Sequence, residues 1–397
     1  MPSSAPASTA PASAAPAVSA APSAAPSTAA AASAAPASAA AASAAAAATP
    51  AASSARPSAA AGSAAASAAT PTRAASPVVV GTPRLNTNVK LTFYNAQHEN
   101  QVGGLLDGFT KEAGIQVEVR SGRDFDLANQ LVQEGASSPA DAFITENSPA
   151  MQLVAAKGLF APIPKDILAQ VPARFSPTTG DWMGMAGRST VFVYNPSKLP
   201  AANLPVSIMD LANATWKDKF GIAPSGADFQ AIVSAVVALK GADAGLAWLK
   251  GLKANAKIYT GNGAIMRAAN AGEIQGGIIY HYYWYQDRAD TGANSKNVEL
   301  HFFKNQDPGG FFSISGLGML KSSKYPNETQ ALLRYITGKA GQQTLANGNY
   351  SLEYTLNPDV PLNPKLKPMN ELSIPDVDIA KLNGPQVIDL MQQAGLL

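Results

Sequence analysis

From about Asn88 onward, the chain alternates short apolar runs with segments in which apolar residues recur at helical spacing. Residues 89–95 (VKLTFYN) alternate as a β-strand, and the spacing over 102–113 predicts an amphipathic helix. Two more short strands are expected at 116–120 and 141–145. Strands that alternate with helices are typical of an α/β fold, in which right-handed crossovers join parallel strands.

The same alternation continues to the end of the chain. Strands are predicted at 189–194, 220–223, 276–280 and 310–320, and helices at 229–239, 244–252, 265–271, 328–337 and 341–347. Roughly 310 residues follow residue 87, which is more than one hydrophobic core usually serves, so we expect two lobes. The long strands near residues 189 and 312 are the candidates to cross between them.

These patterns give a domain hypothesis in five segments. The first lobe (N-lobe) takes residues 88–190 and returns at 313–365, while residues 191–312 form the second lobe (C-lobe). Residues 366–397 are expected to pack on the C-lobe, and residues 1–87 precede both lobes as a separate tail.

The tail differs from the rest in composition. Up to about Pro77 it consists almost entirely of Ala, Ser, Pro and Thr, with Arg56 and Arg73 as its charges. So few large apolar side chains cannot offset the entropy of folding, and the recurring prolines disfavour the alternative of a folded helical repeat. We therefore predict a disordered, partly extended tether.

Charge and cysteine content restrict the classes of function. Three of the 29 Lys and Arg residues lie in 1–87, which leaves 26 against 27 Asp and Glu in the body, so a nucleic-acid partner is not expected. The chain has no cysteine, which excludes disulfides and thiolate metal sites and suits a protein outside a reducing cytosol. With a spacer typical of lipid-anchored proteins and no apolar run that spans a membrane, we expect an extracytoplasmic protein, periplasmic or tethered at the cell surface.

Polar side chains follow three of the predicted strands at their carboxyl ends, where open parallel sheets bind ligands. His98 and Glu99 follow the first strand, Glu146 follows the third, and Tyr282 and Tyr283 follow the strand at 276–280. Each has a simpler explanation when taken singly. The histidine and Glu99 could be solvated, Glu146 could cap a helix, and the tyrosines could line a sugar or peptide site.

Taken together, these side chains have the chemistry of a site for a hard, highly charged cation. Two phenolates and a carboxylate carry three negative charges, which match Fe³⁺, and a neutral imidazole completes four ligands. Zinc or calcium would not need paired phenolates. In addition, residues 220–228 (FGIAPSGAD) predict a strand, a turn of small residues and a helix, and such a turn offers free N–H groups to an anion.

At this point the sequence resembles the bacterial ferric-ion-binding proteins, a branch of the type II periplasmic-binding-protein superfamily. The resemblance runs from about Val89 to Leu397. It is carried by YNAQH at 94–98, PADAFITE at 139–146, WLKGLK at 248–253 and YYWY at 282–285, with QDPG at 306–309 and AGLL at 394–397.

The resemblance implies two lobes, joined by two crossover strands, that close on one Fe³⁺ ion and deliver it to an ABC transporter permease in the membrane. It matches His98, Glu146, Tyr282 and Tyr283 to the iron ligands, and Ser225, Gly226, Ala227 and Asn262 to contacts with a synergistic anion, phosphate or carbonate. One departure is Tyr280, where relatives often have asparagine, so the resemblance does not carry over the second asparagine contact to the anion. A monomer is expected.

Two other readings stay open from the sequence. A binding protein of the same fold could take an organic solute, such as a sugar phosphate or a polyamine, in a tyrosine-rich cleft. An enzyme is not expected, because the sequence has no G-x-S-x-G turn, no phosphate loop with Gly-Lys-Ser/Thr and no histidine pair at metal-ligand spacing.

Overall fold

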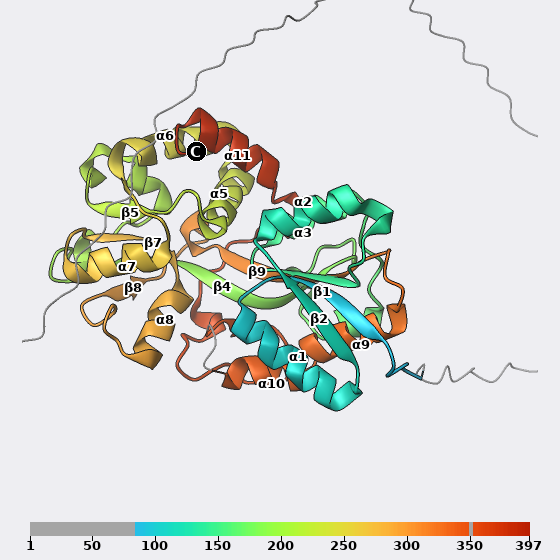
Figure 1. The fold of residues 1–397 in the computed structure, drawn as a ribbon. Coiled ribbons are helices and arrows are strands. Elements are labelled where there is room, and N and C mark those ends of the chain that lie inside the picture. Colours follow the sequence, from blue (N-terminus) through green and yellow to red (C-terminus); the bar gives the residue numbers. More distant parts are fainter. Residues whose placement is uncertain (1–83, 349–351) are drawn as a thin grey trace, which may run out of the picture. The chain divides into compact units, whose positions relative to one another are not determined.

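The computed structural model describes residues 84–348 and 352–397, and all of them belong to one compact unit. The predicted tether lies outside the described residues up to residue 83. Figure 1 shows helices on both faces of a long, twisted sheet, in the layered arrangement of an α/β protein.

Ten strands of the described part of the chain build this sheet. They are β1 (Lys90–Ala96), β2 (Gln116–Ser121), β3 (Ala142–Thr145), β4 (Met183–Tyr194), β5 (Phe220–Ile222), β6 (Lys257–Ile258), β7 (Gly276–Tyr280), β8 (Glu299–His301), β9 (Phe312–Met319) and β10 (Tyr354–Thr355). They follow the order β2-β1-β3-β9-β4-β7-β5-β6, and β8 and β10 pair with β4 outside this path.

The strand β4 belongs to both halves of the sheet. Residues 183–189 pair with β9, which in turn pairs with β3, and residues 190–194 pair with β7. The strands on the β3 side of this point form the N-lobe sheet, and those on the β7 side form the C-lobe sheet. As predicted, β1 runs parallel to both β2 and β3, whereas β9 runs antiparallel to β3 and β4.

Eleven α-helices cover the sheet within the described residues. They are α1 (Glu99–Ala113), α2 (Asp124–Glu134), α3 (Ser148–Ala156), α4 (Lys165–Leu168), α5 (Ala227–Lys240), α6 (Ala242–Asn255), α7 (Asn262–Ala271), α8 (His281–Asp290), α9 (Pro326–Thr337), α10 (Lys339–Asn347) and α11 (Gly384–Gln393). In the N-lobe, α1, α9 and α10 pack together on one face of the sheet and α2 and α3 on the other.

The buried apolar side chains of the described residues form three clusters. Phe93, Leu105 and Phe109 belong to the N-lobe core under α1 and α9, while α7 covers a smaller cluster in the C-lobe around Ile265. A third cluster runs without a break from α2 and α3 of the N-lobe to α5, α6 and α11. Since α11 contacts α3 as well as α5 and α6, the C-terminal helix lies against both lobes.

Most predicted elements agree with the structure to within a few residues, and the α/β class with its crossover strand is confirmed. Two elements differ from the expectation. The segment after β7, for which no helix was predicted, forms the first turn of α8. In addition, β4 starts at Met183 rather than at Ser189, because its buried residues extend back through Gly184 and Arg188. The exact limits of the five predicted domain segments stay a prediction.

Candidate metal centre

The register of the N-lobe sheet places two of the predicted ligands next to each other. Ala96 at the end of β1 is the partner of Thr145 at the end of β3, so the residues that follow both strands emerge side by side. His98 directly precedes α1, and Glu146 follows β3. Their side chains meet, with His98 Nε2 at 3.6 Å from Glu146 Oε1.

The tyrosine pair comes from the C-lobe. Tyr282 and Tyr283 lie in the first turn of α8, immediately after β7, and their rings stack with centroids 4.4 Å apart. The Tyr282 hydroxyl donates a hydrogen bond of 2.9 Å to Glu146 Oε1, and its ring meets the His98 ring edge-on at 5.4 Å. The structure therefore brings residues from both lobes to one point.

A fifth side chain in this cluster was not expected from the sequence. Asp228 lies in the first turn of α5, directly after the Ser-Gly-Ala turn, and is buried. Its Oδ2 accepts hydrogen bonds from both tyrosine hydroxyls, at 3.4 Å from Tyr282 and 3.3 Å from Tyr283. The sequence does contain one signal for Asp228. It is an acidic residue at the start of a helix, where a carboxylate is favoured.

Asn262, one of the predicted anion contacts, also binds Asp228. Its Nδ2 donates a hydrogen bond of 2.7 Å to Asp228 Oδ2, at the place where a free anion was expected. Of the predicted turn, Gly226 directly precedes α5, while Ser225 and Ala227 line a cavity of 500 Å³ together with residues of α2 and α11. Asn262 therefore binds Asp228, while Ser225 and Ala227 face a cavity, and the four anion contacts stay a prediction.

Burial and negative charge keep the phenols neutral in the absence of a metal ion. Burial, followed by the charges of Asp228 and Glu146, raises the pKa of Tyr282 and of Tyr283 well above the ordinary value. Burial, and then repulsion from Glu146, also raises the pKa of Asp228 to about 7. A cation at this point would reverse these shifts, because it stabilises each deprotonated form.

The donor set fits a trivalent cation. Among the described residues, His98 Nε2 is buried without a hydrogen-bond partner, although it faces the oxygens of the cluster. No group of three His, Cys, Asp or Glu side chains among residues 84–348 and 352–397 forms a metal site by itself. Phenol oxygens are therefore needed to complete any such site here, which favours Fe³⁺ over zinc or calcium.

Two other buried side chains support the cluster from below. Arg188 on β4 lies 2.9 Å from Glu146 Oε1, and Glu353 lies 2.8 Å from the other side of the same guanidinium group. The charges of Glu353 and Glu146 outweigh the effect of burial and raise the pKa of Arg188. An arginine within an apolar strand is a sequence signal for a buried acidic partner, but the predicted strand began one residue too late to include it.

The loop after β3 excludes the simpler explanation that Glu146 caps a helix. Glu146 does not cap α3, because α3 starts at Ser148 and Asn147 is the residue that precedes it. The Asn147 and Glu146 N–H groups donate to the buried Asp124 carboxylate, which fixes this loop. Tyr280 is fully buried, with its hydroxyl 3.5 Å from Asn147 Oδ1, so it supports the cluster from beneath.

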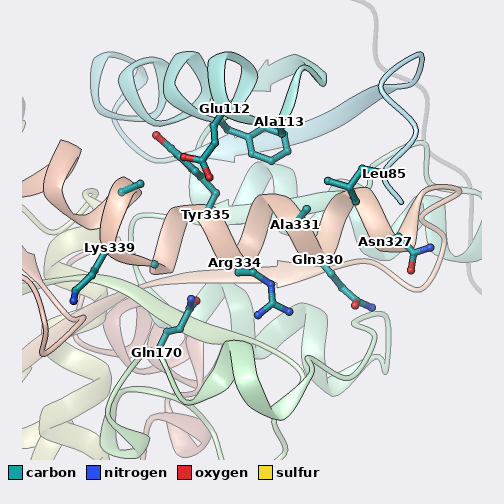
Figure 2. Close-up of a pocket in the computed structure, with 13 residues that line it drawn as sticks. Leu85, Glu112, Ala113, Gln170, Asn327, Gln330, Ala331, Arg334, Tyr335 and Lys339 are labelled. Carbon is teal, nitrogen blue, oxygen red and sulfur yellow. The ribbon is translucent and has the colours of Figure 1, made fainter. Parts of the chain in front are cut away.

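The cluster opens into a cavity of 660 Å³ between the lobes. His98, Glu99 and Asn100 line it from the N-lobe, and Arg267 and the tyrosine pair from the C-lobe. A second cavity, of 480 Å³, lies between α1, α9 and α10 on the outside of the N-lobe (Figure 2). Its lining contains none of the predicted ligands, and its Arg334 and Lys339 pair with Asp166 and Asp359.

A two-lobed α/β fold with a polar cluster where the lobes meet defines the class of solute-binding proteins. Residues 104–392 match the bacterial extracellular solute-binding protein family, and the chain belongs to that family. The family predicted from the sequence motifs is thus confirmed. No helix in the described part of the chain has both the length and the apolar character of a membrane span.

Two similar proteins indicate which kind of solute-binding protein this chain resembles. The chain is 53% identical over 317 residues to the Fe(3+)-binding periplasmic protein of Serratia marcescens, a match that covers 80% of this chain and 94% of that protein. It is 34% identical over 325 residues to the major ferric iron-binding protein of Neisseria meningitidis, which covers 81% and 97%. These relatives are binding proteins rather than enzymes.

Among solved structures, the fold is similar to iron-bound HitA from Pseudomonas aeruginosa. The TM-score is 0.73 and the sequence identity 38%, and the match covers 78% of this chain and all of that one. The predicted type II periplasmic-binding-protein fold is therefore confirmed, whereas the ligand roles of single residues remain predictions.

Proposed function

We propose that this protein captures Fe³⁺ outside the cytoplasm and delivers it to an ABC importer in the membrane. The observation that carries this proposal is the convergence of an imidazole, a carboxylate and two stacked phenols from both lobes. The relatives named for ferric iron support the same function.

In the proposed complex His98, Glu146, Tyr282 and Tyr283 bind the ion. The two phenols lose their protons as iron enters, since a trivalent charge lowers their pKa values far enough for deprotonation. Two phenolates and the Glu146 carboxylate then balance the charge of Fe³⁺. Because the ligands come from both lobes, binding the ion also holds the lobes together.

We further propose that Asp228 supplies the negative charge that the sequence assigns to a synergistic anion. Its carboxylate accepts from both tyrosine hydroxyls and from Asn262, the side chain predicted to contact the anion, and these contacts support the proposal. Binding of a free anion to the Ser225–Gly226–Ala227 turn is the alternative outcome of the tests below. Asp228 and such an anion would repel each other.

The alternative ligand class, an organic solute such as a sugar phosphate or a polyamine, is less well supported. A sugar phosphate needs cationic donors, but Arg188 is buried against Glu146 and Glu353, which leaves Arg267 as the cation in the described lining of the cavity. A polyamine would leave His98 Nε2 without a role. We also propose that the protein is a monomer without catalytic activity, that its macromolecular partner is the permease, and that it binds no nucleic acid.

The experiment is a titration of the iron-free protein with ferric citrate, followed by visible absorbance. We expect a broad phenolate-to-iron charge-transfer band that reaches its maximum at one iron per chain and disappears when a strong chelator is added. Fructose 6-phosphate and spermidine, tested in parallel by thermal shift, should leave the melting temperature unchanged. A colourless protein that either organic solute stabilises would contradict the proposed function.

A further inference from the structure

Arg188 occupies the point at which the chain passes from one lobe to the other. Its neighbour Ser189 pairs with Phe312 of β9 in the N-lobe sheet, and Thr190 pairs with Tyr280 of β7 in the C-lobe sheet. The side chain of Arg188 is fully buried. A cation in such a place is stable only if surrounding groups compensate its charge.

Three groups from different parts of the N-lobe compensate it. The Nη1 atom lies 2.9 Å from Glu146 Oε1, while Nη2 donates to Glu353 Oε2 at 2.8 Å and to Ser315 Oγ of β9 at 2.6 Å. A planar guanidinium group can serve several such acceptors at once in a fixed geometry, which a single ammonium group cannot do.

The pair of Arg188 and Glu353 also reaches His98. Glu353 is as fully buried as its partner, and its Oε1 lies 3.9 Å from His98 Nε2. Gln97, the residue before His98, donates to Glu353 Oε2 and to Ser315 Oγ. One ion pair therefore lies beneath both N-lobe ligands and ties them to β4, which crosses between the lobes, and to its neighbour β9.

The same guanidinium group faces the C-lobe. Its central carbon lies 5.6 Å from the centre of the Tyr282 ring and 5.9 Å from that of Tyr280, within the range of cation–π contacts. Arg188 thus contacts a ligand from each lobe, Glu146 and Tyr282. It cannot bind iron itself, since a guanidinium ion has no lone pair to donate.

We infer that Arg188, paired with Glu353, is a positioning residue that holds Glu146 and His98 in place for the ferric ion and so slows release of the bound ion. This inference rests on the proposed function. A carboxylate fixed before iron arrives need not be ordered as iron binds, and a fixed carboxylate is less free to leave the ion.

The test is the rate at which excess EDTA removes iron, measured from the decay of the visible band. Arg188→Lys keeps the charge but cannot hold Glu146, Glu353 and Ser315 together, so we expect release to be about tenfold faster, as for one lost charge-assisted hydrogen bond. The band maximum should not move, because both phenolates remain. Arg334→Lys on the outside of the N-lobe (Figure 2) is the matched control and should release iron at the wild-type rate.

A second substitution shows whether Arg188 acts through Glu146. If it does, the effect of Arg188→Lys on the release rate should be clearly smaller than tenfold in a Glu146→Ala background, where only the contact through Glu353 to His98 remains. The full tenfold effect in that background would overturn the inference, because a general loss of packing would accelerate release with or without Glu146. An unchanged rate in the single variant would overturn it as well.

A double variant tests the same inference without leaving an unpaired buried charge that would disrupt folding. Arg188→Gln combined with Glu353→Gln removes both buried charges together and keeps groups that can hydrogen-bond. It should release iron faster than the wild type, and the wild-type rate in this variant would contradict the inference. A wild-type protein that binds no iron would contradict the proposed function instead, so the two failures can be told apart.

Discussion

The two halves of the site are built differently. In the N-lobe half, the charge of Glu146 is already balanced by Arg188, and His98 faces the buried Glu353. In the C-lobe half, Tyr282 and Tyr283 are neutral phenols in the first turn of a helix, next to Asp228, whose pKa is raised. One half is an ion-pair network anchored on β4, and the other is a pair of neutral phenols beside a carboxyl group whose pKa is about 7.

This difference suggests that the two halves contribute different properties to the proposed complex. The N-lobe half can keep its geometry without iron, so it determines how the ion is positioned and how fast it leaves. The C-lobe half becomes charged only as protons leave, so most of the affinity, the colour and the proton release originate there. The predictions below test this difference.

The largest effect is expected for the tyrosine pair. Tyr282→Phe with Tyr283→Phe removes both phenolates but keeps both rings, so the fold should persist while the visible band disappears. Affinity for Fe³⁺ should fall by at least about a thousandfold, since two anionic ligands are lost. Each single variant should weaken the band and shift its maximum, as followed in the ferric citrate titration.

Tyr259→Phe is the control for this experiment, because Tyr259 is a C-lobe tyrosine outside the cluster and its loss should leave the colour unchanged. A double phenylalanine variant that still turns coloured and binds iron with wild-type affinity would refute the assignment of the C-lobe ligands.

A smaller effect is expected on the N-lobe side. Glu146→Ala removes a carboxylate that carries no charge-transfer band, so the colour should be retained while affinity falls by about tenfold to a hundredfold. Because iron is then held by one ligand fewer, protons displace it from the phenolates more easily, and it should be released at a higher pH than in the wild type. A pH titration of the visible band checks this, and superimposable curves for the two proteins would mean that Glu146 is not a ligand.

The role of Asp228 can be separated from that of a free anion. In Asp228→Asn the charge is lost but the shape is kept, so affinity should fall by about tenfold. Phosphate should restore part of it, since the charge at residue 228 would no longer repel an anion that binds near Asn262 and the Ser225–Gly226–Ala227 turn. The wild type should bind iron equally well with and without phosphate. A wild type that needs phosphate would show instead that a bound anion, rather than Asp228, supplies the charge.

The sequence predicted the α/β fold and the convergence of His98, Glu146, Tyr282 and Tyr283, because the carboxyl ends of neighbouring strands meet at one edge. It did not reveal Asp228, since a Ser-Gly turn before a helix draws attention to its N–H groups and not to the acid that follows. Glu353 could not be found either. It meets Arg188 across 165 positions of sequence, and nothing in its local pattern marks it as buried.

The smallest effect concerns the stability of the iron-free protein, and it again distinguishes the two halves. Burial and the nearby Glu146 raise the pKa of Asp228 to about 7 in the folded state, whereas in the unfolded chain it has the ordinary value of about 3.9. Between these values the folded protein holds a proton that the unfolded chain has lost. Stability should therefore fall as the pH rises from 5 to 7, by about 2 kcal/mol from this residue, and level off above pH 7.

Asp228→Asn cannot titrate, so the difference between wild type and variant in urea unfolding isolates this contribution from that of other acids. Asp243→Asn, an exposed position in the first turn of α6, should follow the wild-type pH dependence. If wild type and Asp228→Asn lose stability equally between pH 5 and 7, Asp228 is already ionised in the iron-free protein, and the contrast between a charged N-lobe half and a protonated C-lobe half would be wrong.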